Sequence, residues 1–222
     1  MRFVVTAGPT REHLDPVRFL SNPSTGRMGF AVAAAAAARG HEVTLVAGPT
    51  DLRTPKGVSR RNVVSAREML AAVEAALKSA LAAGGPVAFV SVAAVADWRP
   101  ATAATRKLKK AEMSGLLRLV RNPDILKTVR ARLAKRAGAR LQLVGFAAET
   151  NDVLAEAARK CREKGLAFIV ANDVSRADSG FGVATNRVTF VFPDGTRRAL
   201  PLLTKRSVAA RIVRQIECGA SA

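Results

Sequence analysis

The chain predicts an α/β protein, a three-layer sandwich around a mainly parallel sheet. Short apolar runs typical of buried strands alternate with longer helix-like segments over most of its length. Strands that alternate with helices of this length pair in parallel through right-handed crossovers, which place helices on both faces of one sheet. The strand-like runs are 2–6, 42–46, 87–93, 141–145 and 167–171, and the helix-like segments are 28–39, 66–83, 122–136 and 151–164.

The remaining segments predict smaller elements. Residues 187–200 indicate an additional C-terminal hairpin, because residues 187–192 alternate polar and apolar side chains and a Pro-Asp-Gly turn follows them. Residues 205–217 are apolar at helical spacing, so we expect a final helix that packs on the sheet. We expect a loop over 50–61 and a short strand at 62–64.

Composition favours one domain in the cytoplasm. The 222 residues are 49% hydrophobic, which suffices for a full core, so residues 1–222 are expected to form a single domain. No apolar run reaches the length of a membrane span, and we expect no signal peptide. Cys161 and Cys218 are too few for a disulfide framework and have no metal-ligand spacing. Since His13 and His41 are the only histidines, a histidine triad or zinc site is not expected.

The charge is strongly positive, with a formal net charge of +19 at pH 7. Such an excess attracts polyanions, and nucleic acid is one candidate. The cations are spread over the chain, however, and aromatic residues make up only 5%, with no tyrosine to stack on bases. A generally basic proteome or a phosphate-rich substrate explains the charge about as well, so we expect nucleic acid to bind only nonspecifically.

A polar, glycine-bearing turn lies between the first strand and the first helix. Residues 22–30 lead directly into an alanine-rich helix, and at such a turn backbone N–H groups face an anion. The glycine spacing departs from the dinucleotide fingerprint, because only Gly26 and Gly29 lie at the helix entrance and no acidic residue closes the second strand. The turn therefore predicts a phosphate site rather than an NAD site.

Further polar segments follow the predicted strands at their carboxyl ends, where open parallel sheets bind ligands. Asp97 follows the strand at 87–93 beside small residues, and a basic cluster, Arg106–Lys110, lies on an expected loop. Four cations on a loop can neutralise a triphosphate. Each segment also has a structural explanation, as a turn acid and as a solvated charge run.

Three more segments end at the same predicted edge. Asn122 and Pro123 have the residue types of a helix N-cap and first helical position. Phe146 follows the strand at 141–145 and can pack against a base or in the core. Residues 171–175 again place polar groups at a strand end. Because the carboxyl ends of parallel strands meet at one edge, we expect all these segments to converge there.

Taken in this order and spacing, the segments resemble the phosphopantothenoylcysteine synthetase family, the ligases of coenzyme A biosynthesis. The resemblance covers essentially the whole chain and is carried by residues 4–12, 15–22, 24–29, 94–99, 107–110, 122–125, 144–150, 171–175 and 181–186. It implies a Rossmann-like fold and a two-step reaction. The carboxylate of 4′-phosphopantothenate attacks CTP to give an acyl-CMP intermediate and pyrophosphate, and L-cysteine then displaces CMP. Mg²⁺ or another divalent cation is implied, and ATP stays open as the alternative nucleotide.

The resemblance also implies roles for individual residues. Asn22 would hold the acyl-nucleotide intermediate, and Lys107 would form or stabilise the activated acyl group. Arg18 and Ala94 would contact the phosphopantothenate part. The residues that would surround the nucleotide are Ser91, Val92, Ala93, Asp97, Lys107, Pro123, Asp124, Ile125, Leu126, Phe146, Lys160 and Lys164.

Partners follow from the same resemblance. A homodimer is implied, and the hairpin at 187–200 is our candidate for its interface, although a hairpin edge can equally close the sheet within one subunit. Many bacterial members carry this module behind a flavin-dependent decarboxylase domain, so a phosphopantothenoylcysteine decarboxylase on a separate chain is a further expected partner. Two other functions stay open: a nicotinamide-dependent reductase on the same sheet and a basic nucleic-acid-binding protein.

Overall fold

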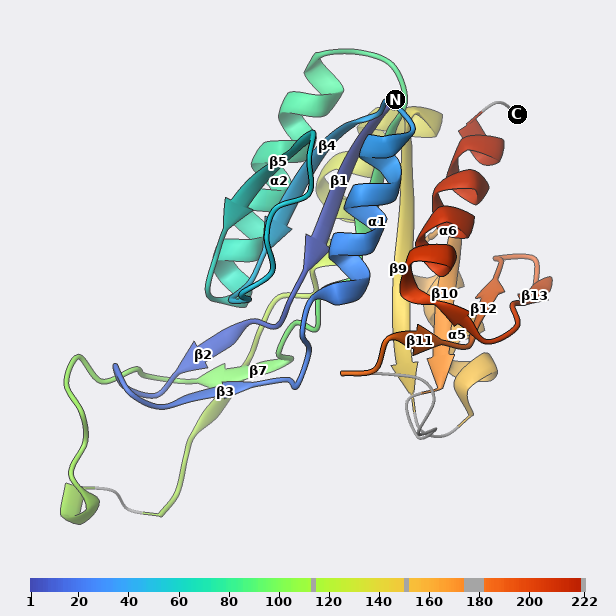
Figure 1. Cartoon of the computed structure of the whole chain (residues 1–222). Coiled ribbons are helices and arrows are strands. Elements are labelled where there is room, and N and C mark those ends of the chain that lie inside the picture. The colour runs from blue at the N-terminus through green and yellow to red at the C-terminus, as the bar shows by residue number, and fades with distance from the viewer. Residues whose placement is uncertain (113–114, 150–151, 174–181, 221–222) are drawn as a thin grey trace.

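The computed structural model describes residues 1–112, 115–149, 152–173 and 182–220, and its centre is one eight-stranded sheet (Figure 1). The strand order is β13-β12-β10-β9-β6-β1-β4-β5. The strands are β1 (Arg2–Ala7), β4 (Glu42–Ala47), β5 (Val58–Asn62), β6 (Val87–Ser91), β9 (Leu141–Glu149), β10 (Phe168–Asp173), β12 (Val188–Val191) and β13 (Arg197–Ala199).

The strands from β5 to β10 in this order run parallel, whereas β12 and β13 are antiparallel to their neighbours. The predicted α/β class and the predicted C-terminal hairpin are therefore confirmed. The chain order reverses between β1 and β6. From β1, the sheet first grows in one direction through β4 and β5, and then in the other direction through β6, β9 and β10. Ligands of open parallel sheets bind outside the carboxyl ends of the strands at such a reversal.

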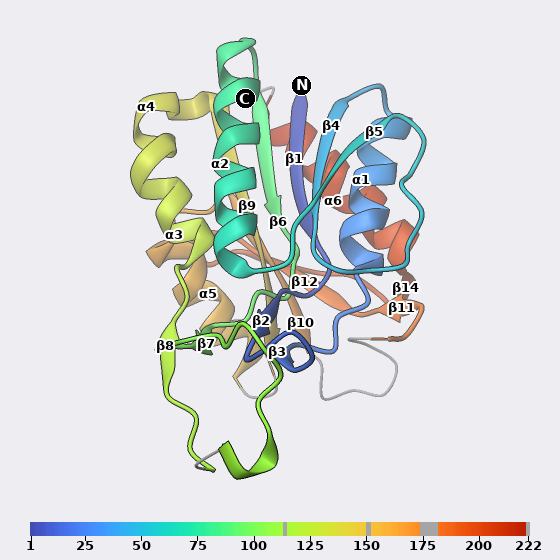
Figure 2. The ribbon, with the colours of Figure 1, turned by 90° about the vertical axis from the view of Figure 1, so that its left-hand side faces the viewer.

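Helices cover both faces of the sheet, so the molecule has three layers (Figures 1 and 2). One face carries α1 (Arg27–Ala38) and α6 (Lys205–Ala220). The other carries α2 (Ala66–Ala82), α5 (Val153–Glu163) and a continuous helical stretch of α3 (Ile125–Val129), a π-helical turn η2 (Arg130–Ala134) and α4 (Lys135–Ala137).

Burial on both faces explains why the central strands are apolar throughout. Phe3 and Val5 of β1 belong to the core on the α1–α6 face, and Val4 between them belongs to the core on the α2 face. This is the period-two alternation of a strand whose two faces are both covered. Cys161 is buried, and burial raises the pKa of its thiol to about 11, so this core cysteine is a poor nucleophile. None of the helices in the described part of the chain is long and apolar enough to cross a membrane.

Two local predictions were wrong. The loop expected over 50–61 contains the edge strand β5, which pairs with β4 from Val58 to Asn62. Its Arg61 is exposed, and its Arg60 lies over the Phe30 ring of α1, 5.1 Å from the ring centroid. Such charged residues hide a strand from an apolar pattern. The helix expected at 122–136 begins only after Asp124, whose side chain accepts a hydrogen bond from the Lys127 N–H at 3.0 Å and is the N-cap in place of Asn122.

The sequence did not predict an arm that projects from the carboxyl edge of the sheet (Figure 1). The arm comprises residues 11–21, 98–112 and 115–121. It contains two short antiparallel ribbons that pack on each other, β2 (Arg11–His13) with β3 (Phe19–Ser21) and β7 (Trp98–Pro100) with β8 (Leu119–Arg121), and a 3-10 turn, η1 (Lys110–Glu112). A last small ribbon pairs β11 (Thr185–Asn186) with β14 (Leu203–Thr204) before α6.

Candidate active site

Two cavities open at the carboxyl edge of the sheet on either side of Phe146. The first, here called the Asp97 cavity, consists of two adjoining hollows of about 210 and 320 Å³. They are lined by Asn22, Ser91, Ala93, Ala94, Val95, Ala96, Asp97, Asn122, Pro123, Asp124, Ile125, Leu126, Phe146, Ala147, Ala148, Lys160, Lys164 and Ile169. The second, the α1 cavity, has a volume of about 110 Å³ and lies at the entrance of α1.

The α1 cavity shares its wall with the Asp97 cavity. Its lining residues are Gly8, Ser24, Thr25, Gly26, Arg27, Met28, Gly29, Val92, Ala93, Ala94, Phe146, Ala147, Ala148, Asn172, Asn186 and Lys205. Ala93, Ala94 and Phe146 belong to both cavities, so one extended ligand can occupy the two together.

The segment after β6 forms the floor of both cavities and is fixed by hydroxyl groups from the β1 side. The Thr6 hydroxyl, which is fully buried, accepts hydrogen bonds from the N–H groups of Val92 (3.1 Å) and Ala93 (3.2 Å). The Thr10 hydroxyl accepts one from the Ala96 N–H at 3.0 Å. Because these bonds hold the backbone, the small side chains of this segment leave its surface open to a ligand.

Asn22 and Asn122 anchor the same segment from two directions. Asn22 donates from its amide nitrogen to the Ala94 carbonyl at 3.2 Å, and Asn122 donates to the Ala96 carbonyl at 2.8 Å. The Asn122 N–H also donates to the Asp97 carbonyl at 2.8 Å. Asn122 therefore positions the turn that carries Asp97, which explains why it does not cap α3.

Opposite this floor, two lysines of α5 and its end line the Asp97 cavity. Lys160 lies in the last turn of α5 and Lys164 one turn later, as their spacing of four predicted. The Lys164 ammonium pairs with the Asp124 carboxylate at 2.8 Å. Burial alone disfavours the charge of Asp124, but the Lys127 N–H and Lys164 outweigh it and lower the pKa of this carboxyl. The pair keeps a cation at the mouth of the cavity.

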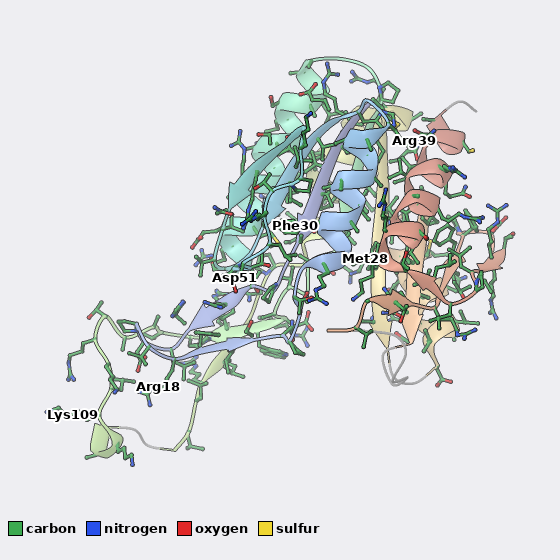
Figure 3. The ribbon with its side chains drawn as sticks, viewed as in Figure 1. Arg18, Met28, Phe30, Arg39, Asp51 and Lys109 are labelled. Atoms are coloured by element: carbon green, nitrogen blue, oxygen red, sulfur yellow. The ribbon has the colours of Figure 1, made fainter. Side chains whose placement is uncertain are left out.

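The entrance of α1 has the form expected of an anion site. Gly26 has a φ of 78°, a left-handed conformation that favours glycine, and no side chain caps the helix. The first N–H groups of α1 therefore face the cavity side of the turn without a side-chain acceptor, and the first turn carries no acidic residue. Figure 3 shows Met28 at this end of α1.

Arg18 and Lys107 lie outside both cavities, on the arm. Arg18 pairs with the buried carboxylate of Asp15, its Nε donating at 3.0 Å, and its Nη2 also donates to the Leu108 carbonyl at 3.0 Å. The Leu108 N–H donates back to Asp15 at 3.2 Å, so the basic segment beside Lys107 is tied to the turn of the β2–β3 ribbon. The Arg18 guanidinium holds the pKa of Asp15 well below its usual range. Figure 3 shows Arg18 and Lys109 far along the arm.

The structure thus assembles every predicted site residue except these two. Of the predicted segments, residues 150, 174–175 and 181 lie outside the described residues. The sequence reasoning missed the residues that hold the floor, Thr6 and Thr10. Thr6 lies inside β1, where threonine has an ordinary strand propensity, and Thr10 lies in the turn between β1 and β2. The sequence reasoning also missed Arg27 and Lys205 of the α1 cavity.

Metal ligation rests on few protein groups. In the described part of the chain, no three or more histidine, cysteine, aspartate or glutamate side chains gather as a metal site. The Asp97 cavity has the carboxylates of Asp97 and Asp124, and Lys164 occupies the second. Mg²⁺ commonly keeps its waters and binds through one or two carboxylates and substrate phosphates. The donor set therefore fits an ion that arrives with a nucleotide, not one held by a protein cage.

A doubly wound sheet with such a site at the chain reversal defines an α/β domain of the ligand-binding, Rossmann-like class. The family model for the DNA/pantothenate metabolism flavoprotein C-terminal domain matches residues 1–218, and the chain belongs to this family. The family resemblance read from the motifs is thereby confirmed.

Known relatives agree with this assignment. The chain is 47% identical over 216 residues to the coenzyme A biosynthesis bifunctional protein CoaBC of Vibrio vulnificus and 44% identical over 219 residues to that of Escherichia coli K12. These matches cover 96% and 97% of the chain and 51% of each relative, so the chain spans about half their length.

Solved structures agree as well. The crystal structure of the C-terminal domain of a CoaBC protein superposes with a TM-score of 0.79 at 40% identity, over 98% of this chain and 94% of that one. The structure of a Cab2 mutant in complex with phosphopantothenate-cysteine has a TM-score of 0.73 at 15% identity, over 99% and 87%, and shares the fold.

Proposed function

We propose that this chain is a ligase that joins 4′-phosphopantothenate to L-cysteine in coenzyme A biosynthesis, with CTP as the activating co-substrate. One observation carries the proposal. Apart from Lys107, the residues that the family resemblance implies for the nucleotide and the intermediate, from segments spread between Asn22 and Lys164, line two adjoining cavities at the chain reversal. The names of the relatives point to the same pathway.

The first step forms an acyl-CMP. In our proposal the nucleoside occupies the Asp97 cavity beside Phe146, and the phosphates extend toward the entrance of α1. A carboxylate oxygen of 4′-phosphopantothenate attacks the α-phosphorus, and the bond to the β-phosphate oxygen breaks. Charge grows on the nonbridging oxygens and on the leaving pyrophosphate, so fixed cations and N–H groups stabilise this transition state. A divalent cation bound to the phosphates supplies further charge neutralisation.

The second step forms the amide. The cysteine amine attacks the acyl carbon, the bond to the CMP oxygen breaks, and CMP leaves. Asn22 lies at the boundary of the two cavities with its amide nitrogen on the Ala94 carbonyl, 3.2 Å away. In this position its remaining donor and acceptor capacity is available to the mixed anhydride, which is consistent with the role implied for it.

We further propose a homodimer that uses the arm. Most of the exposed large hydrophobic side chains lie on the arm: Val17, Phe19, Trp98, Leu116, Leu117 and Leu119. An apolar surface of this kind is typical of an interface. The hairpin, our first candidate, is less suitable, because its outer strand β13 presents Arg197 and Arg198 and two copies would repel each other.

A dimer through the arm would explain the positions of Arg18 and Lys107. Both lie away from their own cavities, on the surface that a second copy would contact, so each would serve the partner's site. In this arrangement a complete site requires one body and the arm of the other subunit.

The activity is tested with purified protein, 4′-phosphopantothenate, CTP, L-cysteine and Mg²⁺. We expect CMP and pyrophosphate only when 4′-phosphopantothenate and CTP are both present, and the amide only with cysteine. ATP in place of CTP, and chelation of the divalent cation, test the nucleotide and the metal. Absence of CMP and pyrophosphate from the complete mixture would refute the proposal.

The dimer is tested by mixing two inactive variants, Lys107→Gln and Asn22→Asp. If the arm acts across the interface, half of the randomly formed dimers regain one intact site of two, and activity returns to about a quarter of wild type. No recovery after verified subunit exchange would place Lys107 in its own subunit's site or outside the mechanism.

A further inference from the structure

Asp15 is a buried carboxylate on the arm to which the resemblance assigns no role. It lies in the turn between β2 and β3 and is 1% exposed. Aspartate is almost never buried to this extent unless it is paired, because burial removes its hydration. Replacing a buried ion pair by apolar side chains of similar volume is often neutral for stability. Stability alone therefore does not explain why this turn holds an acid.

The two carboxylate oxygens of Asp15 have different partners. Oδ1 accepts hydrogen bonds from the N–H groups of Val17 at 2.9 Å and Arg18 at 2.8 Å, which closes the turn of the ribbon. Oδ2 accepts hydrogen bonds from the Arg18 Nε at 3.0 Å and from the Leu108 N–H at 3.2 Å. Oδ1 therefore serves the turn itself, and Oδ2 connects the turn to a residue 93 positions later in the chain.

The Asp15–Arg18 ion pair holds both backbone polar groups of Leu108. The Leu108 N–H donates to Asp15, and the Leu108 carbonyl accepts a hydrogen bond from the Arg18 Nη2 at 3.0 Å. The Leu108 N–H and the Lys107 Cα belong to one planar peptide unit. A hydrogen bond to this N–H therefore also fixes the backbone of Lys107.

The position of the Lys107 ammonium group depends on this backbone. Lys107 is exposed, and a lysine side chain is a flexible stem of four carbons, so its reach is defined only if its Cα is held. The start of the same segment is also tied to the turn, because the Ala104 N–H donates to the Leu14 carbonyl at 2.8 Å. Figure 3 shows that Arg18 and Lys109 lie in this part of the arm.

The charges of this network stay constant near neutral pH. The Arg18 guanidinium above all, and also the N–H groups of Arg18, Val17 and Leu108, keep the pKa of Asp15 well below its usual range. Asp15 is therefore ionised under any ordinary assay condition and accepts from all of its donors. It has no proton to give to a substrate.

We infer that Asp15 is a positioning residue for Lys107, which it holds at a set spacing from Arg18. The inference rests on the proposed function, in which Arg18 contacts the phosphopantothenate part and Lys107 forms or stabilises the activated acyl group. One substrate that is held by Arg18 and activated at Lys107 requires a fixed spacing between the two cations. Asp15 provides it, because it bonds to Arg18 and to the peptide unit of Lys107 at the same time.

The test compares Asp15→Asn, Asp15→Glu and the control His13→Ala. Asparagine has the shape of aspartate, but its amide nitrogen cannot accept the hydrogen bonds that Oδ2 accepts. For Asp15→Asn we expect kcat for CMP formation to fall on the order of 10²-fold, the cost of misplacing a catalytic group by about 1 Å. The KM for CTP should be nearly unchanged, because the Asp97 cavity lies in the body. Asp15→Glu keeps the charge and should recover part of the rate.

His13→Ala weakens the same ribbon without removing a bond to Leu108. The His13 Nδ1 donates to the Asp15 carbonyl at 3.1 Å, and the His13 ring packs on Phe19 with the ring centroids 5.4 Å apart. This variant should lower the Tm but leave kcat for CMP formation unchanged. The comparison separates a positioning role of Asp15 from a contribution to the fold of the ribbon.

Amide hydrogen exchange gives a readout that does not require activity. In Asp15→Asn the Leu108 N–H should exchange faster by about tenfold or more, and in His13→Ala it should exchange as in wild type. Leu108→Pro is a second variant in case Asp15→Asn does not fold. Proline has no N–H and breaks the same bond from the other side, so kcat for CMP formation should again fall while Asp15 and Arg18 stay in place.

Three results would overturn the inference. The first is wild-type kcat in Leu108→Pro, or in Asp15→Asn when exchange at Leu108 is faster, because Lys107 would then act without this tie. The second is an equal loss of kcat in Asp15→Asn and His13→Ala, because Asp15 would then serve only the fold of the ribbon. The third is a lower kcat in Asp15→Asn with unchanged exchange at Leu108. An inactive wild-type enzyme would instead refute the proposed function, whatever the exchange rates are.

Discussion

Replacement of Gly29 by alanine tests how the helix entrance is placed at the sheet edge. Gly29 lies in the first turn of α1, directly over the end of β1. A Cβ at this position would lie 2.5 Å from the Ala7 Cβ, 2.7 Å from the Thr6 carbonyl oxygen and 3.0 Å from the Ala7 Cα. These neighbours belong to the central strand and its backbone and cannot rotate away, so α1 has to move.

The size of the effect follows from two opposing terms. Overpacking of a core costs about 1–3 kcal/mol, whereas alanine is better than glycine in a helix by about 1 kcal/mol. Because three contacts are at or below 3.0 Å, we expect the upper part of that cost, a net loss of about 2 kcal/mol in the free energy of unfolding. For a chain of this size, that corresponds to about 4–8 °C in Tm.

Chemical denaturation followed by circular dichroism measures the loss in the free energy of unfolding. The KM for the nucleotide should also rise, because the N–H groups of α1 move with the helix. Gly219→Ala in α6 is the matched control. Its Cβ would meet only the flexible Gln142 side chain, at 3.4 Å, so stability should be unchanged or slightly higher. Equal stability of Gly29→Ala and wild type would refute the claim that close helix–strand contact fixes the site.

Three further predictions address the floor and walls of the cavities. Asp124→Asn keeps the helix cap but loses the ion pair with Lys164. The pKa of Asp124 is lowered in the folded state, so its ionised carboxylate stabilises the fold. This contribution is complete above about pH 5 and is lost as the pH falls through the folded pKa. The difference in unfolding free energy between wild type and variant should therefore shrink below about pH 4. Thr6→Val leaves two backbone N–H groups of the floor without their acceptor and should cost about 1–3 kcal/mol in denaturation, and an unchanged midpoint would remove the hydroxyl from the argument. Asn22→Asp should make the acyl-CMP hard to trap with labelled CTP, and tight retention of the intermediate by this variant would count against its role.

The sequence predicted the body of the fold because each element there has a local signal. Strands buried on both faces, such as β1 and β6, are mostly apolar, and the long helices carry a periodic apolar face. The edge strand β5 lacks this signal, because every one of its residues except Val58 is polar or charged. Its existence depends on pairing with β4, which a local pattern does not contain.

The arm was missed for a related reason. Its strands have three residues each, too short for a clear pattern. The ribbon β7–β8 also packs on β2, which lies more than eighty residues earlier in the chain.

Asn122 shows a different kind of limit. Both Asn122 and Asp124 are good helix caps by residue type, and only the tertiary bond from Asn122 to the Ala96 carbonyl assigns the cap to Asp124.

The site itself was predictable because parallel strands bring their carboxyl ends together, so motifs distant in sequence share one edge. The sequence could not show from which side of this edge the nucleophile would approach, or on which side the leaving group would depart. The structure arranges cations around this edge in three groups: Lys160 and Lys164 line the Asp97 cavity, Arg27 and Lys205 line the α1 cavity, and Lys107 and Arg18 lie on the arm. An in-line displacement at phosphorus carries negative charge on both sides of the phosphorus atom, on the entering carboxylate and on the leaving pyrophosphate. Cations that stand on several sides of one site can neutralise both charges better than a single basic cluster would.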